Sequence, residues 1–245
     1  PDTKECSSWK FDRMVSTVVP ETDSTVIIAL QDEIVRVNLH DGHTTSVAPI
    51  PDENGKVRCN DGKCDPAGHL WVGTMGFGAP KGAGTLYTVS PAGTVTTKLK
   101  KVTISNGIVW SSNKKFMYYN DTPTGKIARY RYDADNGDIL FDGIAVTLPG
   151  GTGVPDGMAI DSDDHLWGGY GVYCYNPYTG ELLAKVEVPA PNVASCAFGG
   201  KKMDTLYITT ARAGLSEEQL REYPLSGSVF CCKPGVKGVW ANCFG

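Results

Sequence analysis

The sequence predicts an all-β protein built as a β-propeller. Two observations lead to this prediction. A short pattern recurs at intervals of about 40 to 50 residues, and each interval contains four short β-type runs. Helical periodicity is nearly absent, with room for one short exposed helix at residues 215–223. Repeats of this length with four strands each are typical of propeller blades rather than of solenoids or sandwiches.

Each copy of the pattern has a short polar entry ending in glycine, an apolar stretch, a polar turn and a second apolar pair. The entry glycines are Gly62, Gly107 and Gly157. The apolar pairs are Leu70-Trp71, Met117-Tyr118 and Leu166-Trp167, and a fourth copy keeps Leu206-Tyr207. Five clear blades therefore begin near Met14, Asn60, Ser105, Pro155 and Asn192. No linker or shift in composition divides the chain, so we expect a single domain over residues 1–245.

The charge of the chain limits its partners. Net charge is −4 with a pI of about 5.6, and acidic and basic residues are interspersed. This balance argues against nucleic acid or an anionic membrane as the main partner. No apolar run approaches the ~20 residues of a membrane span, and the first ten residues do not resemble a signal peptide. We therefore expect a cytoplasmic protein, monomeric, whose main partner is neither nucleic acid nor a membrane.

The cysteines and histidines are interpreted as structural. Of eight cysteines, several lie in apolar strand patterns, so buried free thiols are expected rather than disulfides or a zinc site. His69 and His165 occupy equivalent turn positions before a Leu-Trp pair, which indicates a role set by the repeat. Trp71, Trp110 and Trp167 recur with the repeat and are expected between blades.

The polar entries carry the candidate site. A propeller places the first strand of every blade around the central channel, so Asn60, Asp61, Asn106 and Asp156 should ring one mouth, although each entry alone could be an ordinary turn. Carboxylate and amide oxygens suit a hard cation such as Ca²⁺, Mg²⁺ or Mn²⁺, and Zn²⁺ is also compatible. Arg58 adds a positive charge that could hold a polyhydroxylated or anionic substrate.

Several motifs together carry a family resemblance. These are RCNDGKCDPAGHLWVGTM, ISNGIVWS, YYNDTPTGKI, VPDGMAIDSDDHLW and SCAFGG. In this combination the chain resembles the regucalcin (senescence marker protein), gluconolactonase and luciferin-regenerating enzyme family over roughly residues 14–240. The resemblance implies a six-bladed propeller with one divalent metal ion (Ca, Zn, Mn or Mg) in its channel and hydrolysis of sugar lactones or related esters.

The resemblance also implies roles for individual residues. Asn106 and Asp156 would be metal ligands, and Asp156 would also be the general base. Arg58 and Asn60 would contact substrate. Glu5 would be the third metal ligand, since it keeps the family's spacing to the tryptophan that follows it.

The chain departs from the family pattern in three ways. The sequence around Glu5 lacks the family's Gly and Pro. The first blade is stunted or absent, so the chain is a five-bladed relative, a six-bladed propeller with a stunted blade, or a truncated product. Lys81 lies in a loop where some members have a substrate-contacting glutamate. Three functions stay open: a metal-dependent, gluconolactonase-like hydrolase, a non-catalytic calcium- or metal-binding regulatory propeller, and a luciferin-regenerating type of enzyme.

Overall fold

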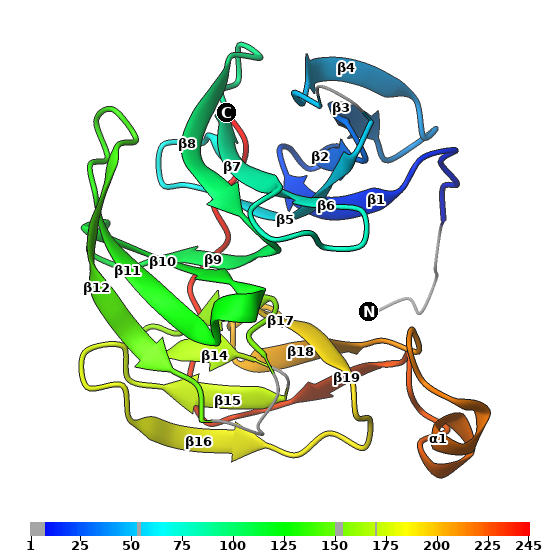
Figure 1. The fold of residues 1–245 in the computed structure, drawn as a ribbon, viewed down its shortest axis with the longest axis vertical. Helices are drawn as coiled ribbons and strands as arrows, with labels where there is room; N and C mark the ends of the chain where they lie inside the picture. The colour runs from blue at the N-terminus through cyan, green and yellow to red at the C-terminus, as the bar shows by residue number, and fades with distance from the viewer. Residues whose placement is uncertain (1–7, 53–54, 150–153, 170) are drawn as a thin grey trace.

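Five antiparallel sheets stand around a common centre in the computed structural model, which describes residues 8–52, 55–149, 154–169 and 171–245 (Figure 1). The first blade comprises β1 (Val15–Pro20), β2 (Thr25–Leu30), β3 (Glu33–Asn38) and β4 (Thr44–Pro49). The second comprises β5 (Val57–Cys64), β6 (Leu70–Gly76), β7 (Gly84–Val89) and β8 (Val95–Val102). The third comprises β9 (Ser105–Trp110), β10 (Phe116–Asp121), β11 (Lys126–Tyr132) and β12 (Ile139–Thr147), with a 3-10 turn η1 (Thr122–Thr124). The fourth comprises β13 (Met158–Ile160), β14 (Leu166–Gly168), β15 (Val172–Tyr175) and β16 (Leu182–Val186). The fifth comprises β17 (Val193–Gly199), β18 (Thr205–Thr210) and β19 (Val229–Cys232), with the helix α1 (Glu217–Glu222) between its last two strands.

The predicted all-β propeller and its five blades are confirmed. The register also confirms the alignment of the repeat, because the first residue of each apolar pair lies opposite the end of the inner strand. These partners are Leu70 and Cys64, Met117 and Trp110, Leu166 and Ile160, and Leu206 and Phe198. The expected short helix is α1, which is fully on the surface and begins at a capping box between Ser216 and Gln219.

The core lies between adjacent blades. Strands of the second and third blades enclose Trp71, Trp110 and Tyr132, whose rings meet edge to face at centroid separations of 5.7 to 6.4 Å. Trp167 packs in the same way against Phe198 between the fourth and fifth blades. All three repeated tryptophans are buried, as predicted. Blade-to-blade packing of large side chains thus fixes how the inner strands face the channel.

The entry glycines are required by close approach of the backbone. A Cβ on Gly62 would lie 2.4 Å from the carbonyl oxygen of Trp71, and one on Gly107 would lie 2.6 Å from that of Asp156. A Cβ on Gly157 would collide with the Ser195 side chain at 2.1 Å. The recurring glycine therefore lets the inner strands pack tightly around the channel.

The ring of blades is open on one side. Inner strands β1, β5, β9, β13 and β17 pack in that order, and the first and fifth blades stand on either side of the opening (Figure 1). Phe11 packs against a cluster in the first blade formed by Ile28, Leu30, Val35 and Val37. Among the described residues there are five sheets, not the six blades that the resemblance implies.

A C-terminal strap, residues 236–245, crosses one end of the channel. It leaves the fifth blade and runs past the fourth blade to the second, as the red segment in Figure 1 shows. The Gly238 N–H donates to the Met203 carbonyl at 2.8 Å, and the Asn242 amide donates to the Cys64 carbonyl at 3.1 Å. Phe244 is buried in the core shared by the first two blades. The strap therefore links the last blade to the first two.

The cysteine prediction holds in part. The seven cysteines in the described part of the chain are free thiols. Cys59, Cys64, Cys174 and Cys196 are buried as expected, but the prediction was wrong for Cys231 and Cys243, which are exposed. Cys231 faces outward because it lies in β19, the edge strand of the three-stranded fifth blade. No helix in the described residues is long and apolar enough to span a membrane.

Candidate functional site

Asn60 and Asp61 lie within an inner strand rather than ahead of it. They occupy the middle of β5, where the pairing register with β6 shifts between Cys59 and Gly62. The expectation that a polar entry precedes its strand was therefore wrong for this blade, and also for the third, where Ser105, Asn106 and Gly107 lie inside β9. An irregularity of this kind changes the direction of the side chains without ending the strand. The polar residues Asn60 and Asp61 can therefore lie within a β-strand.

Arg58 and Asn60 form a hydrogen-bonded pair. The Arg58 guanidinium donates to Asn60 Oδ1 at 2.9 Å and to the carbonyl of Cys59 at 2.9 Å. Asn60 Nδ2 donates in turn to the carbonyl of Ser105 on β9 at 2.8 Å. Burial lowers the pKa of Arg58, although the side chain stays partly accessible. The pair is held in one orientation and links the second blade to the third.

Hydrogen bonds also fix the orientation of the Asn106 amide. Thr122 donates its hydroxyl hydrogen to the carbonyl of Pro155 at 2.9 Å, so its oxygen must accept from Asn106 Nδ2, which lies 2.8 Å away. The same amide also hydrogen-bonds the carboxylate of Asp156. Since the nitrogen serves both neighbours, Oδ1 is the atom that Asn106 can offer to a cation.

Asp156 lies two residues before β13, beside Asn106. Its carbonyl accepts from the Gly107 N–H at 3.2 Å and from Asn120 Nδ2 at 2.9 Å, which fixes the backbone that carries the carboxylate. Burial, and to a smaller extent the nearby Asp61 carboxylate, together raise the pKa of Asp156 to about 6. Hydrogen bonds from the Gly157 N–H and from Asn106 oppose the shift.

Asp61 is the second carboxylate at this mouth. Its Oδ1 accepts from the Gly62 N–H at 2.8 Å. Burial raises the pKa of Asp61, and the positive charge of Lys63 partly offsets that effect. Asp156 and the oriented Asn106 oxygen supply hard oxygen donors, which fit Ca²⁺, Mg²⁺ or Mn²⁺, and Asp61 adds a negative charge that acts on Asp156.

The structure brings together four of the five predicted site residues. Asn106 contacts Asp156, and Arg58 contacts Asn60, whose amide bonds to the residue preceding Asn106. Glu5 lies outside the described residues. Lys81 is exposed on the loop between β6 and β7. Sequence reasoning missed Thr122 and Asn120, although both belong to the NDTPTG motif that follows the Asn106 strand.

In metal-free protein, Asp156→Asn should raise the free energy of unfolding at pH 8 by about 1–2 kcal/mol. The folded-state pKa is raised from 3.8 to about 6, so folding favours the protonated acid. Stability from this group is present at low pH and is lost as pH rises through the window between those values. Urea unfolding in chelator at pH 4, 5, 6 and 8 checks this, and a difference between variant and wild type that does not change with pH would contradict it.

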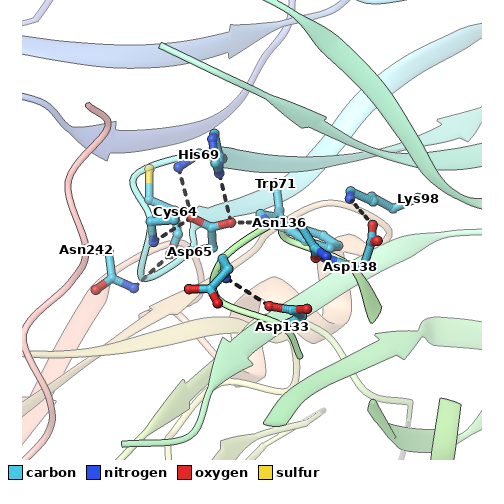
Figure 2. A network of polar contacts seen from close by, with 11 residues as sticks. Cys64, Asp65, His69, Trp71, Lys98, Asp133, Asn136, Asp138 and Asn242 are labelled. Atoms are coloured by element: carbon cyan, nitrogen blue, oxygen red, sulfur yellow. Dashed lines mark hydrogen bonds and ion pairs between the residues drawn. The ribbon is translucent and has the colours of Figure 1, made fainter. Parts of the chain in front are cut away.

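The predicted structural histidines lie in two equivalent turns. Asp65 Oδ1 accepts from the N–H groups of Ala67 and His69, both at 2.9 Å, and its Oδ2 accepts from Trp71 Nε1 at 2.8 Å (Figure 2). His69 Nδ1 lies 3.3 Å from the same Oδ2. We call this arrangement the Asp–Trp turn. Both oxygens of the buried carboxylate are used within the turn, so the histidine is structural there.

The fourth blade repeats the Asp–Trp turn and adds a thiol. Asp161 Oδ1 accepts from the Asp163 and His165 N–H groups, and Oδ2 accepts from Trp167 Nε1 at 2.8 Å. Ligating atoms of Asp161, His165 and Cys174 lie within 4.8 Å of one another, which makes this a possible metal-binding cluster. The hydrogen bonds already occupy both carboxylate oxygens, so the cluster is explained by the turn, as in the second blade.

Three comparisons relate this architecture to known proteins. A family model described as "SMP-30/Gluconolactonase/LRE-like region" matches residues 1–212. A Bacillus subtilis (strain 168) protein named "Putative sugar lactone lactonase YvrE" is 34% identical over 234 residues, covering 94% of this chain and 80% of the relative.

Two solved structures share the arrangement of blades. A calcium-binding protein, regucalcin, from Agrobacterium tumefaciens matches with a TM-score of 0.89 at 29% identity, covering 96% of this chain and 80% of that one. A luciferin-regenerating enzyme matches with a TM-score of 0.85 at 30% identity, covering 96% of this chain and 82% of that one. The segment matched by the family model includes Arg58, Asn60, Asn106 and Asp156.

Proposed function

This chain belongs to the SMP-30/gluconolactonase/LRE-like family, and on that premise we propose that it is a lactone hydrolase that uses one divalent metal ion. The observation that carries the proposal is the pairing of Asn106 and Asp156. The hydrogen bond from Asn106 Nδ2 to Thr122 supports this pairing, because it leaves the Asn106 oxygen available to a cation near the Asp156 carboxylate. Asn106, Asp156 and Glu5 are the proposed metal ligands.

The proposed reaction adds water across the ester bond of a lactone. When bound, the cation would polarise the lactone carbonyl and lower the pKa of a coordinated water. Asp156 takes a proton from the attacking water, whose oxygen bonds to the carbonyl carbon. The ring C–O bond then breaks, the departing alkoxide takes up a proton, and the product is an open-chain hydroxy acid.

Arg58 and Asn60 are the proposed substrate-binding residues. Asn60 Oδ1 already accepts from Arg58, so the pair presents mainly N–H donors. Donors of this kind bind ring and hydroxyl oxygens of a sugar lactone. Because Arg58 is also fixed by the Cys59 carbonyl, little side-chain entropy remains to be lost on binding.

A non-catalytic calcium-binding role is the second candidate. It is favoured by the likeness to the Agrobacterium regucalcin, which is described as a calcium-binding protein. Processing of a luciferin derivative is a third candidate, on the likeness to a luciferin-regenerating enzyme. The monomeric state and the cytoplasmic location expected from the sequence stay predictions.

A panel assay separates these candidates. Purified protein is tested on aldonolactones of five- and six-membered rings, with and without chelator, and metal binding is measured by calorimetry. The hydrolase proposal expects turnover that chelator abolishes and added Ca²⁺, Mn²⁺, Mg²⁺ or Zn²⁺ restores. Metal binding without turnover on any lactone would select the calcium-binding role, and turnover that survives complete metal removal would overturn metal dependence.

A further inference from the structure

Lys63 crosses the channel beneath the candidate metal site. It lies on β5 two residues after Asp61, and each of the two charged groups shifts the pKa of the other, so they lie close together. Its Nζ donates to the carbonyl of Met158 on β13 at 2.8 Å. Strand β9 lies between β5 and β13 in the ring, so this hydrogen bond passes over one blade. The ammonium is therefore held inside the channel rather than at its rim.

Lys63 and the strap line the same pocket. Lys63 borders a cavity of about 130 Å³ whose other walls include Val109, Phe198 and the strap residues Val239 to Asn242. Burial lowers the pKa of Lys63, while Asp61, the first opposing influence, raises it. A partly buried ammonium is stabilised by a counter-charge, and the Asp61 carboxylate supplies it.

Lys63 belongs to the group of charged side chains at the mouth. Among the described residues, Asp61 and Asp156 contribute two negative charges there, and Arg58 and Lys63 contribute two positive charges. The Asp61 carboxylate raises the pKa of both Asp156 and Lys63, so one negative charge acts on the metal-ligand candidate and on the ammonium. Without Lys63, two carboxylates would face each other with one cation fewer in a poorly hydrated channel.

We propose that Lys63 is the counter-ion of the metal site: held by the Met158 carbonyl, it balances the Asp61 carboxylate in metal-free protein and lowers the affinity of the site for a divalent cation. The inference rests on the proposed function, since it takes the cation to bind at Asn106 and Asp156. Lys63 is a positioning residue for charge and does not contact the substrate.

If Lys63 has this role, Lys63→Met and Asp61→Asn should change the Ca²⁺ affinity in opposite directions. Lys63→Met removes a positive charge near the cation and should tighten Ca²⁺ binding about tenfold. Asp61→Asn removes a negative charge and should weaken it about tenfold. A purely structural role predicts that both substitutions weaken binding, because both would loosen β5. The sign of the Lys63→Met effect therefore separates the two explanations.

Calorimetric titration of metal-free protein with Ca²⁺ alone is the test. Lys98→Met is the matched control. Lys98 is also largely enclosed, with 11% of its side chain exposed, but it forms an ion pair with Asp138 between the second and third blades. The control should leave Ca²⁺ affinity within twofold of wild type. Weaker binding in Lys63→Met, or equal shifts in both lysine variants, would overturn the proposal.

A second measurement tests the charge pair without any metal. In chelator, Lys63→Met should lower the Tm by about 5 °C, because it leaves the partly buried Asp61 carboxylate without its counter-charge. The double variant Lys63→Met/Asp61→Asn should recover at least half of that loss. No recovery would overturn the pairing. If wild type binds no Ca²⁺ while the double variant recovers, the pairing stands and the proposed metal site fails.

Discussion

Replacing Asp156 with asparagine should lower kcat for lactone hydrolysis by about a thousandfold. The asparagine keeps the size of the side chain and an oxygen that can face a cation, but it cannot take a proton from water. KM should change little, because Arg58 and Asn60 bind the substrate through contacts that do not involve Asp156. Steady-state kinetics at saturating metal measure both constants on the lactone that wild type hydrolyses best.

Two controls make this result specific. Metal affinity of the variant is measured first, so that kinetics are compared at equal occupancy. Arg58→Gln should show the reverse pattern, a rise in KM of tenfold or more with a smaller effect on kcat, because it removes donors for the substrate and leaves the base. Full turnover of the Asp156 variant at saturating metal would exclude Asp156 as the general base.

Replacing Asp65 with alanine should lower the free energy of unfolding by about 3–5 kcal/mol, or the Tm by about 10 °C. The carboxylate is fully buried and accepts from two backbone N–H groups and from the Trp71 indole. Alanine would leave these donors buried without partners and open space beside Trp71. Thermal unfolding followed by circular dichroism measures the change.

The chain contains its own controls for the Asp–Trp turn. Asp161→Ala should cost as much, since Asp161 repeats the contacts in the fourth blade. Asp133→Ala should change the Tm by no more than 1–2 °C, because Asp133 is exposed and accepts only one backbone N–H in its turn. If Asp65→Ala and Asp133→Ala lowered the Tm equally, the buried hydrogen bonds of Asp65 would add no stability beyond those of an exposed turn.

The repeat made the fold predictable from sequence. The entry glycines and the apolar pairs recur at the same position in successive blades, because each inner strand must pack closely against its neighbour around one channel. Gly107 illustrates this, since a Cβ there would clash with the next inner strand. The same geometry brought Asn106 and Asp156 together, although 50 residues separate them by number.

Contacts outside the repeat could not be predicted in this way. Thr122 reaches the site from a 3-10 turn after β10, and no periodic pattern marks it. The Lys63 hydrogen bond skips a blade, whereas the repeat relates only neighbours. The Asp–Trp turn did carry a signal, because the spacing from Asp65 to His69 and Trp71 recurs at Asp161, His165 and Trp167.

The C-terminal strap has a consequence for the order of folding. Phe244 lies in the core of the first two blades with residues such as Val19, Ile27 and Leu70, which precede it by most of the chain length. Those blades emerge before the strap during synthesis, yet their shared core stays incomplete until residues 236–245 are available. Contacts this distant in sequence slow folding, since loop closure costs entropy before packing compensates for it. We therefore expect the early blades to form a loosely packed intermediate that becomes rigid only when the C-terminal segment docks.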